Sequence, residues 1–269
     1  DRQAILGSGS FAVVVAGRFC WMPVAVKIPK TMKDVSSVSN ELRVIRQVRH
    51  PNIVLFYGAS VNVESGKILL VLERLQGQTL HEFIYTTDTT FETKMDIMVG
   101  VGSALLYLHS RTPGIVHCDL KASNIMVKAS GRPLLLDFGL SRLMTGTARP
   151  IGGSIRYAAP EILVNGTQRP KANVDIFSFG RVLYHVAYGR KPLAHLTPPQ
   201  ILEMAQNKEV PELEWGNQRG LDKLRSLVMR CVEVDPHSRP ATEVVFRELC
   251  ALPMRGRRRL VRTTEWSPS

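Results

Sequence analysis

The chain has 269 residues, 44% of them hydrophobic, which is enough to bury a large core in one or two domains. It has no apolar run of the roughly 18 residues that a membrane-spanning helix needs, so no such helix is predicted. The formal charge of +12 would suit anionic partners, but part of the excess lies in Arg255–Arg262, and no zinc-finger, helix-turn-helix or aromatic-interleaved basic pattern predicts nucleic-acid binding.

Glycines mark the first predicted hairpin. Within Leu6–Val15, the turn residues Gly7, Ser8 and Gly9 lie among apolar residues of high strand propensity, which predicts a strand, a turn and a second strand. Glycines let backbone N–H groups approach phosphate oxygens closely, although most such pairs are ordinary turns. Because no helix is predicted to follow, the pattern does not fit a dinucleotide-binding fingerprint.

The next strand and helix each carry one candidate charge. Pro23–Ile28 predicts a strand with Lys27 among apolar residues, and Val38–Val48 predicts a helix with Glu41 beside an apolar stripe. Glu41 could pair with Lys27, and the alternative for both is a solvated surface charge. We expect His50–Val54 to end this helix and to start another strand.

A change of character follows in the middle of the chain. Ile68–Glu73 predicts a buried strand, and the polar Arg74–Thr79 predicts the boundary between a strand-rich and a helix-rich part. Thr89 and Glu92 resemble a capping box for the next helix. The apolar stripe of that helix is assigned to the core and comprises Met95, Met98, Val101, Leu105 and Leu108.

The most informative stretch is His117–Asn124, followed by Asp137–Gly139. The short apolar runs Ile125–Val127 and Leu134–Leu136 predict two buried strands with a turn between them. Such a hairpin would bring three oxygen-bearing side chains to one edge, namely Asp119, Asn124 and Asp137. Together they could hold Mg²⁺ and orient a hydroxyl group.

The remainder predicts a loop and three helices. A polar, aperiodic segment runs from Gly139 to Ala159 and predicts a functional loop. Helices are predicted at Asp175–Val186, Leu221–Cys231 and Ala241–Leu252. The first is apolar nearly all round and is therefore predicted to be buried, so the carboxyl group of Asp175 needs a partner.

Taken in order, these motifs resemble the signature set of eukaryotic protein kinases: a glycine loop, V-A-x-K, a helix Glu, H-x-D-L-K-x-x-N, D-F-G and A-P-E. The match runs from residue 6 to about residue 250. His50–Val54, Gly153–Tyr157 and Ser178–Gly180 are most similar to the tyrosine-kinase-like group of serine/threonine kinases, such as the Raf and mixed-lineage types. The resemblance implies an α+β, bilobal fold, with a small, mainly antiparallel β lobe that carries one helix and a larger, mainly helical lobe.

The resemblance also implies ATP and Mg²⁺ as cofactors and assigns their chemistry to residues. Asp119 would accept or orient the proton of the substrate hydroxyl, and Lys121 would neutralise the transferring phosphoryl group. Lys27, held by Glu41, would bind the α- and β-phosphates. The other implied contacts are Asn124 and Asp137 for Mg²⁺, and Leu6, Gly7, Ser8, Gly9, Val14, Ala25, Met126 and the backbone of Glu73 and Leu75 for the nucleotide.

Three structural roles follow from the same resemblance. Asp175 would anchor the backbone near His117, and Glu161 would form a salt bridge with Arg239. A stacked spine, which forms only in the active arrangement, would comprise Ile45, Phe56, His117 and Phe138.

Two residues depart from the family pattern. Ala12 replaces the third glycine of the loop, which is a mild change. Cys118 stands where the family usually has an arginine that receives an activating phosphate, and a thiol cannot form that charge-assisted bond. We therefore hypothesise that activation-loop phosphorylation has little effect, or that it works through another base such as Arg142 or Arg149. Replacing Ser141, Thr145 and Thr147 together with Ala tests this.

The sequence thus predicts a serine/threonine protein kinase of intracellular signalling, acting on protein substrates with Ser/Thr hydroxyls. The alternative is a pseudokinase that binds ATP or serves as a scaffold. Its usual sign is the loss of a residue that carries the chemistry, but all five are present: Lys27, Glu41, Asp119, Asn124 and Asp137. We expect a kinase domain at 1–253 (small lobe 1–73, hinge 74–79, large lobe 80–253) and a basic tail or linker at 254–269. The absence of an initiator Met leads us to expect a longer chain with regulatory regions. Four widely spaced cysteines favour a reducing, cytoplasmic location.

Overall fold

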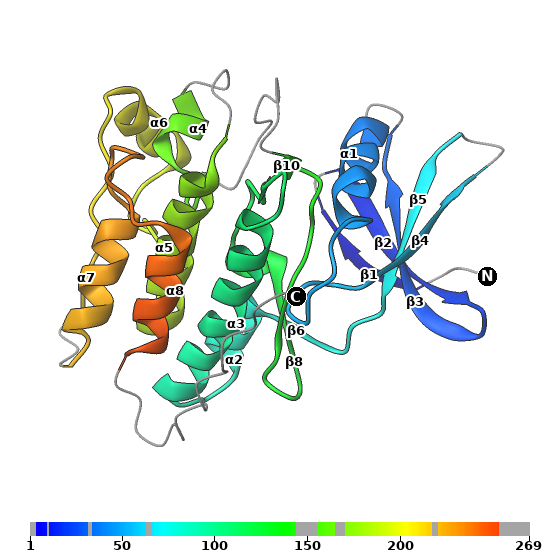
Figure 1. Ribbon diagram of the computed structural model, residues 1–269, viewed down its shortest axis with the longest axis horizontal. Coiled ribbons are helices and arrows are strands. Elements are labelled where there is room, and N and C mark those ends of the chain that lie inside the picture. Colours follow the sequence, from blue (N-terminus) through cyan, green and yellow to red (C-terminus); the bar gives the residue numbers. More distant parts are fainter. Residues whose placement is uncertain are drawn as a thin grey trace, which may run out of the picture.

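The computed structural model describes residues 4–9, 11–31, 34–62, 66–143, 155–164, 170–216 and 220–252. They form a strand-rich lobe and a larger helical lobe (Figure 1), so the predicted bilobal α+β fold is confirmed. The basic tail predicted at 254–269 lies outside the described residues. The predicted bounds of the two lobes and the hinge stay a prediction.

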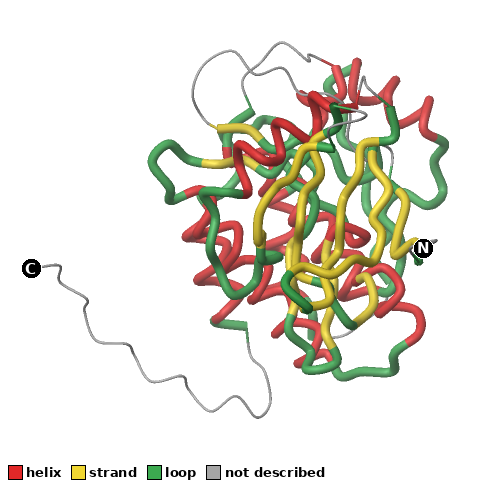
Figure 2. Tube along the Cα trace, turned by 90° about the vertical axis from the view of Figure 1, so that its right-hand side faces the viewer, coloured by secondary structure: helices red, strands yellow, loops and turns green. Residues whose placement is uncertain are grey.

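The small lobe is built on a five-stranded antiparallel sheet in the order β1-β2-β3-β5-β4, which faces the viewer in Figure 2. Cys20 and Trp21 join β2 to β3 with φ values of 47° and 68°, the left-handed conformation that a two-residue hairpin turn requires. One helix, α1, packs against β3 and β5. The elements are β1 (Ile5–Ser8), β2 (Ala12–Phe19), β3 (Met22–Pro29), α1 (Val35–Ile45), β4 (Phe56–Val61) and β5 (Ile68–Glu73).

The large lobe is arranged around α5, whose residues from Val174 to Ala187 are all buried. Helix α5 packs against α3, α7 and α8, and the small sheet β6-β8-β9 lies between this bundle and the small lobe. The elements are β6 (Gly77–Thr79), α2 (Leu80–Thr86), α3 (Phe91–His109), β7 (Ile115–Val116), the 3₁₀ turn η2 (Ala122–Asn124), β8 (Ile125–Lys128), β9 (Pro133–Leu135), β10 (Arg142–Leu143), α4 (Pro160–Val164), α5 (Ala172–Tyr188), α6 (Pro198–Gln206), α7 (Asp222–Cys231) and α8 (Thr242–Cys250).

The predicted apolar stripe of α3 is confirmed as core, because all five of its side chains are at most 1% exposed. The predicted capping box at its start is wrong. The helix begins at Phe91, its N-cap is Thr90, and the Thr90 hydroxyl accepts a hydrogen bond from the Thr93 amide at 3.2 Å. A capping box occurs one helix earlier, where Thr79 and Glu82 exchange bonds of 2.8 and 3.2 Å at the start of α2.

The prediction that His50–Val54 starts a strand is also wrong. Helix α1 already ends at Ile45, and the next strand, β4, begins only at Phe56. The segment runs instead beside β9 of the other lobe, where the Val54 amide donates to Leu135 O at 3.1 Å. These backbone bonds join the two lobes and explain why Ile53 and Val54 are buried without being part of the large sheet.

No helix among the described ranges is both long and apolar enough to cross a membrane. All four cysteines lie within these ranges, and no disulfide joins them.

Candidate active site

The predicted hairpin brings Asn124 and Asp137 to the same edge of a sheet. Strand β8 pairs with β9 in antiparallel register, with Ile125 opposite Leu135. The Leu136 amide then donates to Asn124 O at 2.8 Å, so the residues just outside both strands lie side by side. The two short apolar runs of the sequence are therefore what positions these polar groups.

Asp119 is held from two directions at this edge. Its Oδ2 accepts a hydrogen bond from Lys121 Nζ at 2.8 Å and another from Asn124 Nδ2 at 3.0 Å. Asn124 Nδ2 also donates to Asp119 O at 2.9 Å. Asp119 and Asn124 are only 8% and 7% exposed, so the carboxylate has one defined orientation in a site largely closed to water.

Lys27 joins three elements that lie far apart in the sequence. Its Nζ lies 2.6 Å from Oε2 of Glu41 on α1 and 2.8 Å from Oδ1 of Asp137, which follows β9. The predicted pairing of Lys27 with Glu41 is confirmed, and the alternative of solvated charges is wrong. The Lys27 side chain is 12% exposed, whereas that of Asp137 is 42% exposed, so the cluster is accessible from the Asp137 side.

The charges of this cluster determine one another. Burial acts to lower the pKa of Lys27, but Glu41 and Asp137 outweigh it and hold the pKa above its ordinary value. Burial raises the pKa of Glu41, and the ammonium group of Lys27 opposes that rise. Burial also acts to raise the pKa of Asp137, but Lys27 outweighs it and the pKa is lowered. Lys27 is thus a fixed cation beside an ionised Asp137.

Asp175 supports the backbone beneath the site. It is fully buried at the start of α5, and its carboxylate accepts the amides of His117 at 2.7 Å and Cys118 at 2.8 Å. His109 Nε2 adds a third bond at 2.9 Å. These bonds hold Cys118 at φ 66°, a left-handed conformation that residues with a side chain rarely adopt. The predicted anchoring role of Asp175 is confirmed.

The residues expected to form a spine are all buried. The rings of His117 and Phe138 meet edge to face, with centroids 5.1 Å apart, and His117 Nε2 lies 2.9 Å from Leu136 O. Ile45 and Phe56 belong to the same apolar core as Phe138. Since the amide of Phe138 also contacts Glu41 Oε1 at 3.4 Å, this core and the Lys27 cluster form one connected unit.

The two glycines at the end of β1 are not required by the backbone. Neither Gly7 nor Gly9 has a positive φ. A Cβ on Gly7 would meet no atom within 4 Å, and a Cβ on Gly9 would meet only Ala12 O, at 3.8 Å. Gly7 pairs with Val14, which in turn lies opposite Lys27. The missing side chains therefore leave open space near a fixed cation, which fits a phosphate-binding turn.

The residues expected to contact adenine come from both lobes. Val14 and Ala25 lie on β2 and β3, whereas Met126 lies on β8. The Glu73 amide already donates to Leu55 O at 2.8 Å, and its carboxylate contacts Lys128 Nζ at 2.6 Å. Any adenine bond at Glu73 would therefore have to use its carbonyl oxygen, and the other polar backbone group of this set is that of Leu75.

A magnesium ion fits this site only as part of a nucleotide complex. Among the described residues, no group of three or more His, Cys, Asp or Glu side chains could hold a metal. Asn124 uses its amide nitrogen on Asp119, which leaves its Oδ1 as the oxygen that could face a cation, beside the half-buried Asp137. Mg²⁺ is typically held by one or two such oxygens, with phosphates and water completing the shell.

The structure gives Cys118 an apolar setting. Its side chain packs in a buried cluster with Leu140 and Phe177, and its thiol lies 3.8 Å from Val116 O. Ser141 is fully buried and donates to His117 O at 3.1 Å, so it belongs to the support of the site and not to an accessible phosphorylation loop. Two further phosphorylation candidates, Thr145 and Thr147, lie outside the described residues.

Other contacts confirm the predicted salt bridge of Arg239 and add one residue, Asn40, that the sequence did not predict. Arg239 forms a two-pronged salt bridge with Glu161, at 2.6 and 2.9 Å, as predicted. Asn40 was not singled out, yet its amide bonds Gly139 O at 3.1 Å and Ser141 O at 2.8 Å. Its position one residue before Glu41 was the available signal, since a polar side chain there can reach the residues after Asp137.

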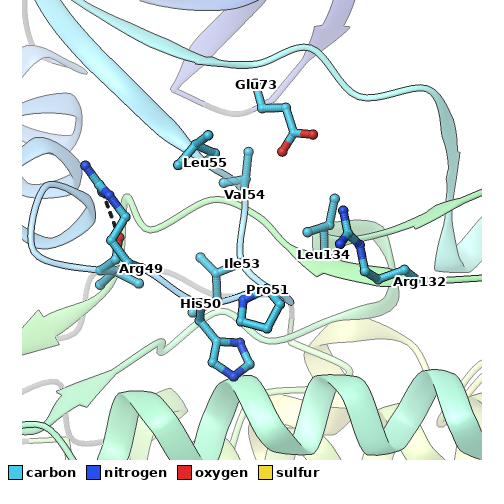
Figure 3. A pocket seen from close by; sticks show the side chains of 10 residues that line it. Arg49, His50, Pro51, Ile53, Val54, Leu55, Glu73, Arg132 and Leu134 are labelled. Atoms are coloured by element: carbon cyan, nitrogen blue, oxygen red, sulfur yellow. Dashed lines mark hydrogen bonds between the residues drawn. The ribbon is translucent and has the colours of Figure 1, made fainter.

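A hollow in the surface, shown in Figure 3, lies away from the cluster of Lys27, Glu41 and Asp137. It has a volume of about 200 Å³ and is lined by the loop from Val48 to Leu55, by Arg132 and Leu134 near β9, and by Glu73. His50 points from it toward α3, where its ring stacks on Tyr107 at 5.1 Å. Of the predicted site residues only Glu73 lines it, so it is not the nucleotide site that the sequence predicts.

Comparison with known proteins gives consistent matches over nearly the whole chain. A family model described as a protein kinase domain matches residues 1–250. Dual specificity protein kinase shkD of Dictyostelium discoideum is 31% identical over 260 residues, which cover 92% of this chain and 34% of that protein. Serine/threonine-protein kinase VIK of Arabidopsis thaliana is 30% identical over 93% of this chain and 59% of that protein. Serine/threonine-protein kinase TNNI3K of Mus musculus is 30% identical over 93% of this chain and 31% of that protein. The chain thus spans less than two thirds of each of these relatives.

Proposed function

The chain belongs to the protein kinase family, and from this premise we propose that it transfers the γ-phosphoryl group of ATP to Ser and Thr hydroxyls of protein substrates in intracellular signalling. The observation that carries the proposal is the ordered set of charges: Lys27 between two carboxylates, beside an Asp119 held by Lys121 and Asn124. The names of the relatives, which are serine/threonine and dual specificity kinases, support a hydroxyl acceptor.

Asp119 is the group that we assign to the acceptor hydroxyl. Its carboxylate would accept the hydroxyl proton while the hydroxyl oxygen bonds to the γ-phosphorus and the bond between that phosphorus and the leaving ADP oxygen breaks. The bonds from Lys121 and Asn124 fix its direction before substrate arrives, and such preorganisation accounts for much of the catalysis of phosphoryl transfer. Lys121 would also stabilise the negative charge on the transferring group, since its ammonium lies only 2.8 Å from the same carboxylate.

The nucleotide side of the site would use the Lys27 cluster. ATP would supply the phosphoryl group, and Mg²⁺ bound with it would neutralise part of the negative charge of the phosphates. Lys27 would bind the α- and β-phosphates and Glu41 would hold it in position, while the backbone of Gly7, Ser8 and Gly9 would cover the phosphates. The metal ligands would be Asn124 and Asp137. Leu6, Val14, Ala25 and Met126 would enclose the adenine, with the backbone of Glu73 and Leu75 at its edge.

We extend the proposal to the organisation of the chain. The kinase domain would occupy 1–253, with lobes at 1–73 and 80–253 around a hinge at 74–79, and 254–269 would be a basic tail or linker. The relatives are much longer than their matched part, which supports further regulatory regions in the whole protein. Four cysteines without a disulfide support a cytoplasmic location.

The test compares wild type with Asp119→Asn for transfer from ATP to a generic Ser/Thr substrate. We expect the variant to lose about 10²- to 10⁴-fold in rate, the usual contribution of a positioned acid or base. Nucleotide binding, followed by thermal shift, should persist in Asp119→Asn and weaken in Lys27→Ala. A wild type that binds ATP and transfers nothing under several activating conditions would establish the pseudokinase alternative instead.

A further inference from the structure

A cavity of about 390 Å³ lies next to the proposed acceptor site. Lys121 lines it, and the Nζ of this residue is 2.8 Å from the carboxylate of Asp119. The walls come from five separate segments, so the cavity is a product of the fold and not of one loop. The described lining residues are His81 on α2, Lys121 and Ser123 after Asp119, Ile155, Arg156 and Tyr157 before α4, Lys191 after α5, and Pro198 on α6.

The polar walls of this cavity are basic. Arg156 donates one guanidinium nitrogen to Leu193 O and the other to Leu196 O, the latter at 2.8 Å. Both acceptors are neutral carbonyls, so these bonds hold Arg156 in place without bringing an anion to it. Lys191 is exposed and is not part of any salt bridge among the described residues. Within the described part of the chain, the one lining cation that a carboxylate offsets is Lys121, through Asp119.

Two buried residues of α5 contact the lining residues Arg156 and Tyr157. Arg181 is 2% exposed and donates Nη1 to Arg156 O at 2.9 Å, and its Nε has no partner among the described residues. A buried cation is poorly screened, so Arg181 adds to the positive potential at Arg156, the lining residue that it contacts. His185, also buried, lies between the hydroxyls of Tyr157 at 2.8 Å and Tyr85 at 3.0 Å.

Several observations indicate that the positive charge is not balanced nearby. No Asp or Glu is among the described lining residues. The sequence segments 144–154 and 165–169, which flank the region of Ile155–Val164, contain no Asp or Glu either. Burial, together with His81 and Lys191, lowers the pKa of His185 to about 4, as expected where the surroundings are positive.

We propose that this cavity binds an anionic side chain of the protein substrate, a carboxylate or a phosphomonoester, a few residues from the acceptor hydroxyl. The proposal rests on the proposed kinase function and names its substrate class. Arg156 supplies a planar, oriented donor for such an anion, and Lys191 supplies a mobile point charge at the rim. Because an extended chain advances about 3.3 Å per residue, an anion within about three residues of the acceptor can reach the cavity.

The test uses synthetic peptides with one Thr acceptor in an otherwise neutral Ala/Gly sequence. Asp, phosphoserine or Lys is placed singly at each of the positions within about three residues of Thr on either side. We expect kcat/KM to rise about fivefold or more for Asp at one or two positions, with a larger rise for phosphoserine, which carries more charge. Lys at the same positions should lower kcat/KM. Raising the salt to about 0.5 M should reduce the preference.

A charge-reversed variant identifies the cavity as the cause. In Lys191→Glu, kcat/KM for the acidic peptide should exceed kcat/KM for the neutral peptide by about twofold or less. The same variant should have a higher kcat/KM for the Lys peptide than wild type has. The matched control is Lys223→Glu, an exposed lysine on α7 that does not line the cavity, and its ratio should equal that of wild type. Because Lys191 is exposed, a denaturation curve can establish that the variant is folded before its kinetics are compared.

The possible failures are distinguishable. Transfer to neutral and acidic peptides at equal kcat/KM would overturn this inference and leave the kinase function intact. An acid preference that survives Lys191→Glu would overturn the assignment to this cavity. Absence of transfer to every peptide would refute the proposed function, and fluorescence anisotropy of a labelled phosphoserine peptide with wild type and Lys191→Glu would then decide whether the cavity binds anions at all.

Discussion

Replacing Asp175 by Asn tests whether the buried end of α5 positions the catalytic residues. The Asp175 carboxylate accepts three hydrogen bonds, from the amides of His117 and Cys118 and from His109 Nε2. Asparagine has nearly the same shape but only one acceptor oxygen, so its NH₂ group must face at least one N–H donor. One buried donor then loses its partner, and the remaining bonds lose the contribution of a charged acceptor.

The expected loss of stability follows from these contacts. An unsatisfied buried donor costs about 1–3 kcal/mol, and hydrogen bonds to a charged acceptor contribute about 1.5–3 kcal/mol each. Allowing for the removal of a buried charge, we expect Asp175→Asn to lower the free energy of unfolding by about 2–4 kcal/mol. This is less than the usual total of about 5–15 kcal/mol, so the variant should still fold.

The effect on catalysis should appear in kcat. The amide bonds hold Cys118 in a left-handed conformation, which costs about 1–2 kcal/mol for a residue with a side chain. When they weaken, this backbone can relax and shift Asp119. Misplacement by about 1 Å can cost about 10²-fold in rate, so we expect kcat to fall tenfold to a hundredfold while KM for ATP stays within about twofold.

Urea denaturation and a phosphoryl-transfer assay below the denaturation midpoint measure the two effects separately. Asp222→Asn, on the exposed first turn of α7, is the control and should change stability by less than about 1 kcal/mol. A wild-type kcat in an Asp175→Asn protein that has lost stability would contradict the positioning role. Unchanged stability would contradict the hydrogen-bond reasoning itself.

Two further predictions concern buried bases of α5. Burial lowers the pKa of His185 to about 4, so as pH falls below about 6.5 the unfolded chain binds a proton that the folded chain does not. Between pH 7 and pH 5, the free energy of unfolding of wild type should therefore fall by about 2 kcal/mol more than that of His185→Gln. The control is His237→Gln, at an exposed histidine, and its unfolding free energy should follow that of wild type. Equal pH dependence in all three proteins would contradict the assignment. Burial also lowers the pKa of Arg181 to about 9, which disfavours the folded state while the group is charged. Arg181→Met should raise the free energy of unfolding at pH 7 by about 1–4 kcal/mol. The control Arg18→Met, at an exposed arginine, should leave that free energy unchanged. If Arg181→Met is instead destabilised, the bond from Arg181 to Arg156 O outweighs the cost of burying the charge.

The sequence predicted those parts of the site whose chemistry lies at the ends of strongly patterned elements. Asn124 and Asp137 follow directly from two short apolar runs, because the hairpin geometry leaves little freedom for the residues just outside the strands. Lys27 and Glu41 required more, since their pairing depends on how α1 packs on the sheet. Only the ordered set of motifs, and not either residue alone, pointed to that contact.

The misses have different physical causes. Thr90 is the N-cap of α3 because the helix begins one residue later than the pattern of Thr89 and Glu92 implied. Helix α2 has only seven residues, too few to show a helical period, although Thr79, the last residue of the predicted hinge, and Glu82 just after it carried a capping signal. His50–Val54 pairs across the lobes with β9, and no local propensity reports such a contact.

The unusual residues Cys118 and Arg181 can be understood together. Two guanidinium groups lie over the ring of Phe177, that of Arg181 at 4.5 Å and that of Arg239 at 4.8 Å from the ring centroid. Cys118 packs in the same buried cluster as Phe177. An arginine at position 118, as the family resemblance implies, would bring a third cation toward this ring, where burial and, after it, the charge of Arg239 already lower the pKa of Arg181 to about 9. A small neutral thiol avoids that repulsion. The structure therefore gives a physical reason for the departure at Cys118: the positive charge beneath the substrate region is supplied by α5 instead of by the catalytic loop.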